Sequence, residues 1–545
     1  MNKIKRNKDI IILSILSFLS VTLVCLFHFG GDDILFHLDN IKNIVDNFHL
    51  VIKGKYFIMP NIGNDLGYGL YIFYPILPHL IYGIIAKLLG YIGISVQASI
   101  ILTNGIVSSI STICFYHLSN KLFKNKKRAF YASLFFVFFP YRISNYLFRE
   151  AINESFCLIF IPLILTSFIY LEEKNKKLFY IFFCIGYIGL FLSHLVISMY
   201  FTIILFIYLL FNHKKYLKKG MIIDYILATL FVIIMVLPNI IMIFEHSKLN
   251  YIVFINNIMT NLNLLKQNSL HIKDFFSFYI HGVLMYFPLI YIFTFLITFY
   301  YDFKNKEIKN NLCYLIPIIL LIIYLTYLPW EYMPKLFQMI QFPWRLELLL
   351  CVFFSLYTSH FVVYFDKTVF KCIFIVMIGL SMIVNYQYLL TKNPDYSSYK
   401  IQYKYGEGYV HEYYPAEYAF YNIYYEDKKD IDVMLGSAKI KIKSKYPNLV
   451  FEASDVKGQV MIELPRIYYK GYDFEIDGDK VTYGRGETGL IKAYILKNGT
   501  YTLTYNGTPA YQILRLIRFL FILTFVYFLV LKKLGIWKGK VNENN

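Results

Sequence analysis

A short stretch near the N-terminus carries residues suited to acid–base chemistry. Residues 30–39 read Gly-Gly-Asp-Asp-Ile-Leu-Phe-His-Leu-Asp and directly follow an apolar run. If this stretch is helical, Asp33 and His37 share one face at i,i+4 spacing. Paired acids at a membrane–water boundary are costly unless they are solvated or partnered. Asp32 and Asp33 therefore predict a carboxylate base; the alternative is a helix cap, in which an aspartate accepts backbone N–H bonds.

A second charged group contains the arginines Arg142 and Arg149 and the acids Glu150 and Glu154. If the segment is helical, the two glutamates are one helical turn apart. Charges just inside a spanning segment usually face a cavity or each other. An arginine can bind a phosphate through two parallel hydrogen bonds, which lysine cannot do. The group therefore predicts an anion site, and a structural Arg–Glu pair that stabilises the bundle is the alternative.

Three further polar residues stand at the edges of apolar segments. His194 lies between two such segments, so it is either a functional group or a structural polar group at a helix junction. Arg345 closes the sequence Phe342-Pro343-Trp344-Arg345 at the start of another segment. The positive-inside rule disfavours an arginine on the outer side, so Arg345 is a candidate anion contact. Tyr74 opens the sequence Tyr74-Pro75-Ile76-Leu77-Pro78 and is a supporting polar group.

The composition identifies the scaffold that must position these residues. The chain has 545 residues, of which 57% are hydrophobic and 16% charged, against about 25% charged in soluble domains. Its mean hydropathy is +0.50. Apolar runs of about twenty residues, the length that crosses a bilayer, recur along the sequence. We therefore exclude a soluble enzyme and expect a polytopic membrane bundle in contact with membrane lipids.

The net charge of +19 carries a topology signal rather than a nucleic-acid site, because the excess bases fall mostly in short loops between apolar runs. All seven cysteines lie inside apolar segments, which does not support a disulfide framework or a zinc site. The sequence predicts about twelve transmembrane helices with both termini in the cytoplasm. The predicted spans are 9–29, 97–119, 129–141, 152–171, 178–193, 195–211, 221–242, 284–301, 312–328, 346–365, 370–390 and 511–531.

The apolar stretch 70–93 decides the orientation of every later segment. If it crosses the membrane, the basic clusters near residues 121–128 and 214–219 fall outside. If it lies in the outer interface, both clusters fall inside, as the positive-inside rule requires. Two prolines, a histidine and several tyrosines near its start also suit an interfacial segment. We therefore predict an interfacial segment.

Three domains follow from this topology. Residues 1–390 form an all-α transmembrane domain with an outer loop at 30–70. Residues 391–510 are nearly neutral in charge and predict a small extracytoplasmic β-domain. Polar and apolar residues alternate at 439–443 and at 474–477. Together with turn signals such as Asp477-Gly478, this alternation indicates antiparallel strands. Residues 511–545 form a last helix and a basic cytoplasmic tail.

Under this topology, the candidate acids, arginines and histidines of these segments all reach the outer face. Acids, arginines and histidines that converge there suit a reaction between a lipid-linked phosphate donor and an acceptor at the membrane surface.

The acidic motif after the first span, the Tyr74–Pro78 sequence and the Arg149–Glu154 motif resemble those of GT-C-type membrane glycosyltransferases. Within that class the chain resembles the bacterial membrane proteins labelled 6-pyruvoyl-tetrahydropterin synthase-related, a label that does not indicate pterin chemistry. The C-terminal part is similar to the YfhO family through 411–415 and 465–472.

The resemblance implies a GT-C-like fold in the bacterial cell membrane. It also implies inverting transfer of a sugar from a polyprenyl-phosphate donor to a cell-envelope polymer or lipid acceptor on the outer face. Asp33 or Asp32 would be the general base, and we favour Asp33 because His37 is its i,i+4 partner. Arg149 and Arg345, with Arg142 beside them, would bind the donor phosphate.

Other interpretations of the sequence stay open. A divalent metal is an alternative, because Asp32, Asp33, His37 and Glu150 supply ligand types, but their spacing is not specific to a metal site. No other cofactor is indicated. A transporter or flippase of lipid-linked sugars would need charges near mid-membrane and internal repeats, and the sequence shows neither clearly. An inactive scaffold for envelope assembly is the third hypothesis.

Overall fold

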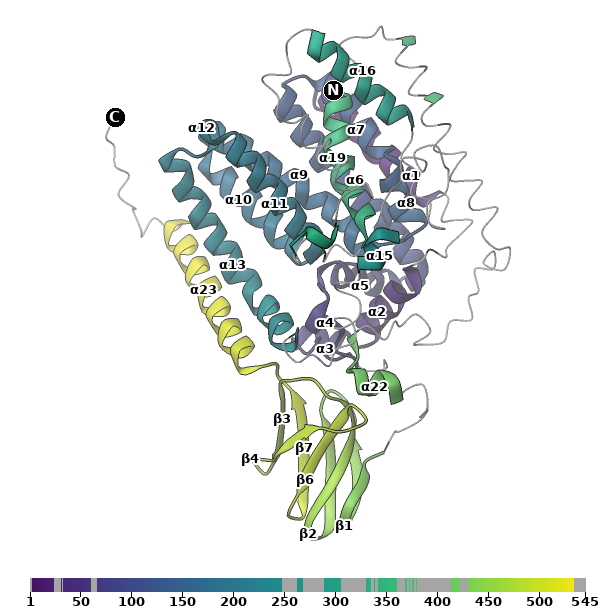
Figure 1. Cartoon of the computed structure of the whole chain (residues 1–545), viewed down its shortest axis with the longest axis vertical. Coiled ribbons are helices and arrows are strands. Elements are labelled where there is room, and N and C mark those ends of the chain that lie inside the picture. Colours follow the sequence, from purple (N-terminus) through teal and green to yellow (C-terminus); the bar gives the residue numbers. More distant parts are fainter. Residues whose placement is uncertain are drawn as a thin grey trace. The chain divides into compact units, whose positions relative to one another are not determined.

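The protein is seen here in a computed structural model (Figure 1). It describes residues 2–23, 31, 33–59, 66–247, 262–267, 289–304, 330–334, 338, 342–359, 413–421 and 430–533, with isolated positions between 368 and 379. Two compact units divide the chain. The first comprises Met1–Val51, Tyr74–Ala228 and Val253–Glu412, and the second comprises Ile52–Phe73, Thr229–Ile252 and Tyr413–Asn545.

The first unit is helical. Its helices are α1 (Asn2–Thr22), α2 (Ile34–Asp46), α5 (Leu77–Gly90), α6 (Val96–Phe123), α7 (Lys126–Val137), α8 (Pro140–Leu147), α9 (Ile152–Glu172), α10 (Lys176–Phe191), α11 (Leu195–Phe211), α12 (His213–Tyr216), α15 (Leu262–Gln267), α16 (Leu289–Lys304) and α19 (Glu347–Thr358), with the 3-10 turns η5 (Trp330–Tyr332) and η6 (Pro343–Leu346). Two helices run from one unit into the other: α3 (Phe48–Ile52) and α13 (Lys219–Ser247).

Small residues let the helices of the first unit approach closely. A Cβ atom on Gly105 of α6 would lie 2.5 Å from the Phe18 ring of α1. A Cβ on Gly189 of α10 would lie 2.1 Å from the Phe160 ring of α9. Glycines at such contacts are typical of membrane helices, whose association depends on close packing rather than on the hydrophobic effect.

The predicted span 129–141 is wrong at its C-terminal end. Helix α7 ends at Val137, and a separate buried helix, α8, begins at Pro140. Proline favours the first position of a helix, because its fixed φ suits the helix and its missing N–H is not needed there. Because of this break, Tyr141 belongs to the separate short helix α8, which ends two residues before Arg149.

The apolar stretch 70–93 also divides. Helix α4 (Leu70–Phe73) belongs to the second unit, and α5 begins at Leu77 after Pro75. Neither piece reaches the roughly 20 residues that a crossing helix needs. Whether the stretch lies in the outer interface or crosses the membrane stays a prediction.

Four helices of the described residues are long and apolar enough to cross a membrane: Val96–Phe123, Ile152–Glu172, Lys219–Ser247 and Pro509–Tyr527. The predicted number of about twelve spans is therefore not confirmed. The predicted spans 178–193, 195–211, 284–301 and 346–365 correspond wholly or partly to the shorter helices α10, α11, α16 and α19. The span 312–328 and most of 370–390 lie outside the described residues.

The basic loops that contain Lys121 and Lys215 lie at the same end of α9. Lys121 at the end of α6 pairs with Glu173 after α9 at 2.9 Å. Lys215 of α12 pairs with Glu172 at 2.9 Å. Residues 154 and 172 stand at opposite ends of α9, about 27 Å apart at 1.5 Å per residue. This is close to the ~30 Å thickness of a bilayer core.

The second unit contains the predicted β-domain. Its strands are β1 (Asp432–Ser444), β2 (Leu449–Ile467), β3 (Tyr472–Ile476), β4 (Asp479–Lys480), β5 (Tyr483–Arg485), β6 (Leu490–Ile495) and β7 (Gly499–Tyr505). The sheet order is β4-β3-β7-β2-β6-β5, with β1 paired to β2, and every pairing is antiparallel. Asp477 and Gly478 both have positive φ at the turn between β3 and β4, as the sequence predicted.

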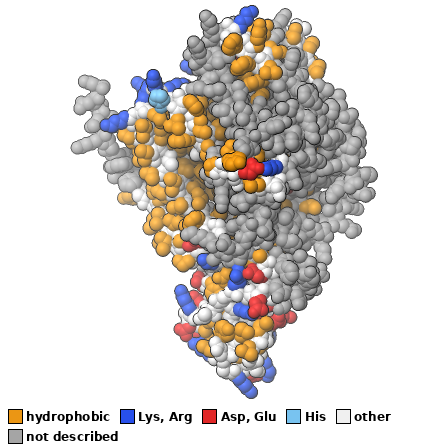
Figure 2. All heavy atoms as spheres, viewed as in Figure 1, with side chains coloured by type: hydrophobic (Ala, Val, Ile, Leu, Met, Phe, Trp, Pro, Cys, Tyr) orange, Lys and Arg blue, Asp and Glu red, His pale blue; other side chains and the backbone are white. Residues whose placement is uncertain are grey.

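Helix α23 (Pro509–Lys533) follows the sheet and lies beside α13 in Figure 1. The two helices are joined within the second unit by Arg518, whose Nη1 donates to the carbonyl of Met235 at 3.1 Å and to Oδ1 of Asn239 at 3.3 Å. Figure 2 shows apolar side chains over the region of α13 and α23. Exposed residues such as Leu230, Leu516 and Leu520 belong to this surface, which suits contact with lipid tails.

Candidate functional site

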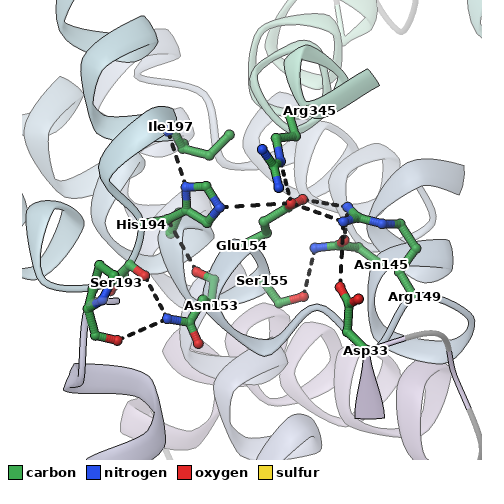
Figure 3. Close-up of polar contacts among 12 residues, drawn as sticks. Asp33, Asn145, Arg149, Asn153, Glu154, Ser155, Ser193, His194, Ile197 and Arg345 are labelled. Atoms are coloured by element: carbon green, nitrogen blue, oxygen red, sulfur yellow. Dashed lines mark hydrogen bonds and ion pairs between the residues drawn. The ribbon is translucent and has the colours of Figure 1, made fainter. Parts of the chain in front are cut away.

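A buried glutamate at the start of α9 contacts several charged and polar side chains (Figure 3). Glu154 binds Arg149 through two hydrogen bonds, Nη1 to Oε2 at 2.6 Å and Nη2 to Oε1 at 3.1 Å. Arg345 donates from Nε to Oε1 at 3.0 Å, and the Tyr141 hydroxyl donates to Oε2 at 2.9 Å. One carboxylate therefore fixes two guanidinium groups that come from distant parts of the chain.

The turn between α8 and α9 places the Arg149 side chain next to Glu154. Helix α9 begins only at Ile152, and Glu150 has a left-handed φ of 48°. The expectation that Glu150 and Glu154 stand one helical turn apart is therefore wrong, because Glu150 precedes the helix. Instead, Glu150 accepts a hydrogen bond from the Gly31 backbone N–H at 2.7 Å, which ties the turn to the chain before α2.

Asp33 faces the same arginine from the start of α2. Its Oδ2 lies 3.7 Å from Nη2 of Arg149, and its backbone N–H donates to the Arg149 carbonyl at 2.9 Å. Asp33 occupies the cap position of α2, but its side chain makes no capping hydrogen bond. Its side chain is 45% exposed, whereas that of Glu154 is 3% exposed. The Asp33 carboxylate is therefore partly exposed to solvent.

His194 approaches Glu154 from the junction of α10 and α11. Its Nδ1 accepts a hydrogen bond from the Ile197 backbone N–H at 3.3 Å, so Nε2 carries the proton of the neutral ring. Nε2 lies 3.9 Å from Oε1 of Glu154. Burial and the nearby charge of Arg345 lower the pKa of His194 to about 3, so the ring is neutral at pH 7. His194 therefore borders the charged group without adding charge.

Next to the charged group, His37 pairs with a histidine that sequence reasoning did not single out. Its Nδ1 lies 2.7 Å from Nε2 of His79 in α5, and both rings are buried. Burial lowers the pKa of both residues, that of His79 to about 3, and the neighbouring His79 and Arg149 further lower that of His37. Tyr74 stacks on His79 with ring centres 5.7 Å apart. The His37–His79 pair thus joins α2 to α5.

Arg142 makes a separate set of contacts. Its buried guanidinium donates to the Val137 carbonyl at 2.9 Å and to hydroxyl groups of α1 and α6, including Ser17 at 2.9 Å and Ser108 at 2.8 Å. These bonds hold α8 to α1, α6 and the end of α7. The structure does not bring Arg142 into the group around Glu154, so its predicted role as a phosphate ligand gains no support from this geometry.

The predicted base Asp32 and the predicted metal site stay untested. Asp32 lies outside the described residues. Among the residues that the structure does describe, no group of three or more His, Cys, Asp or Glu side chains is arranged to hold a metal ion. A metal held partly by Asp32 stays untested, and Glu150, the other acid of that proposal, is engaged with Gly31.

The structure adds polar residues that the sequence did not reveal. Asn145 accepts from Arg149 Nη1 at 3.0 Å, and Asn153 donates to the carbonyls of Pro75 at 3.1 Å and Ser193 at 2.9 Å. Asn145 precedes Arg149 by four positions, a spacing from which the sequence could have predicted this contact. Asn153 stands four positions after Arg149 in the sequence, but its partners are backbone carbonyls of two other segments, which the sequence does not indicate.

A comparison with known protein families matches the segment that contains part of this site. Residues 75–242 match the family model of dolichyl-phosphate-mannose-protein mannosyltransferases. The match includes Arg149, Glu154 and His194 and covers less than a third of the chain, without Asp33 and Arg345. No curated protein matches the sequence.

The match supports the resemblance to GT-C-type membrane glycosyltransferases. The mostly helical architecture, with its apolar helices and C-terminal β-domain, fits a membrane protein of that class. The resemblances to the pterin-synthase-related proteins and to the YfhO family stay predictions.

Proposed function

We propose that the protein is an inverting membrane glycosyltransferase that moves a sugar from a polyprenyl-phosphate donor to a hydroxyl acceptor of the bacterial cell envelope. The observation that carries the proposal is the exposed carboxylate of Asp33, 3.7 Å from an arginine that Glu154 holds in place. The family match at 75–242 supports this class of donor.

In the proposed reaction, Asp33 accepts the proton of the acceptor hydroxyl. The hydroxyl oxygen forms a bond to the anomeric carbon as the bond from that carbon to the donor phosphate breaks, and the lipid phosphate leaves with the bonding electrons. A positioned general base typically contributes 10²–10⁴-fold to such a step. The exposed position of Asp33 suits contact with an acceptor that enters from water.

The leaving phosphate gains negative charge, which Arg149 and Arg345 are placed to stabilise. The carboxylates of Glu154 and Asp33 offset part of the positive charge of the two guanidinium groups, and Asp33 loses its negative charge when it takes a proton. Because Glu154 and Asn145 fix Arg149 before substrate arrives, little rearrangement is needed.

We place this site on the outer face of the membrane. The Glu154 end of α9 is opposite the end at which Lys121 and Lys215 form ion pairs. The positive-inside rule predicts that the lysine-rich end faces the cytoplasm. The charged group would then open toward the external leaflet, with both chain termini inside.

The test is sugar transfer by the purified, reconstituted chain from a radiolabelled polyprenyl-phosphate donor. We expect Asp33→Asn to lower transfer by about 100-fold or more. Asp46→Asn, at the far end of the same helix, is the matched control and should transfer normally. Normal transfer by Asp33→Asn in membranes that contain folded protein would overturn Asp33 as the base. Movement of the lipid-linked sugar across vesicles without transfer would instead favour a flippase.

A further inference from the structure

A second basic group lies in the other unit, at the start of α23. Lys53 and Lys55 flank Gly54 in the turn after α3, and Arg515 lies in the second turn of α23. The Arg515 guanidinium sits directly on the glycine, since a Cβ atom built there would be 3.2 Å from its Nη2. Gly54 has a left-handed φ of 71°, a conformation that glycine adopts without strain. Two lysines therefore belong to the turn that the Arg515 guanidinium contacts, and we call these three residues the basic turn cluster.

The basic turn cluster has no acidic partner in the described part of the chain. None of its three side chains appears in an ion pair with a described carboxylate, and Lys53 and Arg515 are exposed. Burial, together with the neighbouring charge of Lys53, lowers the pKa of Lys55. The positive charges of Lys53 and Lys55 repel each other, so an anion from outside the chain would stabilise the turn.

The surroundings of the cluster are those of a membrane surface. Arg515 follows Tyr511, whose hydroxyl is hydrogen-bonded to Tyr56, and Phe57 packs against the Tyr511 ring at 5.0 Å. Tyrosines concentrate at the level of lipid headgroups. Apolar side chains on the following turns of α23, including Leu516 and Phe519, are exposed as lipid contact requires. The cations thus stand where the polar and apolar parts of a lipid meet.

We propose that the basic turn cluster binds the phosphate of an anionic lipid headgroup. The guanidinium of Arg515 can form two parallel hydrogen bonds to phosphate oxygens, and the two lysines add charge on either side. The lipid tails would lie along the exposed face of α23. The proposal concerns the second unit alone and does not depend on sugar transfer.

The test uses the full-length chain in detergent micelles and counts bound lipid by native mass spectrometry. Dioleoyl phosphatidylglycerol, dioleoyl phosphatidylcholine and inorganic phosphate are added at matched concentrations. We expect selective binding of phosphatidylglycerol, and a loss of about 5-fold in affinity for each base that is removed in the Lys53→Gln, Lys55→Gln, Arg515→Gln series. The matched control, Lys441→Gln/Lys457→Gln/Lys480→Gln, removes equal charge from the β-domain and should keep the selectivity.

Three results would overturn the proposal. The first is equal binding of the two lipids, and the second is undiminished selectivity for phosphatidylglycerol in the variant that lacks all three bases. The third is displacement of phosphatidylglycerol by inorganic phosphate at equal concentration, which would indicate a site for free phosphate. If the triple variant does not fold, the single variant Arg515→Gln still tests whether the cluster binds phosphatidylglycerol. It should bind phosphatidylglycerol about 5-fold more weakly, with Arg515→Lys between it and the unmodified chain.

Discussion

Arg345 donates its Nε–H to Oε1 of Glu154 at 3.0 Å, although 191 positions separate the two residues. The same carboxylate binds Arg149, five positions before it. Glu154 therefore links the turn that follows α8 to the 3-10 turn that begins α19, and it sets the distance between the two guanidinium groups.

Removing the charge of Glu154 should destabilise the protein strongly. Glu154→Gln would leave Arg149 and Arg345 facing each other in a buried site, and breaking such a buried pair typically costs about 3–5 kcal/mol. The measurement is chemical unfolding of the detergent-solubilised chain. Glu173→Gln, which breaks the partly exposed pair with Lys121, is the control and should cost about 0–1 kcal/mol. Equal losses in the two variants would contradict the central role of Glu154.

Arg345 should affect turnover more than donor affinity. If it stabilises charge that develops on the leaving phosphate, Arg345→Gln lowers kcat by about 100-fold with a small change in donor KM. Arg345→Lys should recover part of the loss, because it restores charge but not the planar fork. Steady-state kinetics of sugar transfer measure both constants, with Arg485→Gln of the β-domain as the control. A raised KM at normal kcat would show that Arg345 only helps to bind the donor.

Gly31 should be intolerant of a methyl group. A Cβ atom there would lie 2.6 Å from the Phe148 carbonyl oxygen and 2.7 Å from Cγ of Glu150, so Gly31→Ala must move the chain that leads to Asp33. A displacement of about 1 Å can cost up to 100-fold in rate. We expect transfer to fall while the chain still folds. Gly90→Ala, whose Cβ would have no neighbour within 4 Å, should transfer normally.

The His37–His79 pair should make stability depend on pH. Burial lowers the pKa of both rings in the folded state, that of His79 to about 3, against about 6.5 in the unfolded chain. The folded state then binds fewer protons than the unfolded state. The stabilisation is complete above pH 6.5 and is lost as the pH falls toward the folded values, by up to about 1.4 kcal/mol per pH unit for each proton.

This pH dependence is measured by chemical unfolding in detergent between pH 8 and pH 5. The double variant His37→Gln/His79→Gln should make the profile less steep, because glutamine does not titrate in this range, while His194 still contributes. His213→Gln, a change at an exposed helix end, should leave the slope of the native chain intact. An unchanged slope in the double variant would mean that other groups set the acid sensitivity.

Labelling of introduced cysteines tests the assignment of the two faces. Asn498→Cys, in the turn between β6 and β7, should react with a membrane-impermeant maleimide in intact cells. Lys174→Cys, after the lysine-rich end of α9, should react only after the cells are permeabilised. Both are made in a chain whose native cysteines are replaced by serine. The opposite pattern would place the proposed reaction in the cytoplasm.

Much of the local structure was predictable from the sequence. The apolar runs around α6, α9 and α11 identified those helices within a few residues, because long apolar segments in a membrane protein satisfy their backbone only as helices. Asp477-Gly478 predicted the hairpin between β3 and β4 for a different local reason, since glycine and aspartate tolerate the positive φ of such a turn. The break before Pro140 was missed, because hydropathy continues through it without change.

The pairing of side chains was decided by the tertiary structure. The sequence alone determined that acids, arginines and histidines stand at the ends of apolar segments. It paired Asp33 with His37 by helical spacing, whereas the fold pairs His37 with His79 and turns Asp33 toward Arg149. Which groups meet depends on how each helix is rotated about its axis and on where the chain breaks between helices. Packing between distant segments sets both, and spacing along one segment carries no information about them.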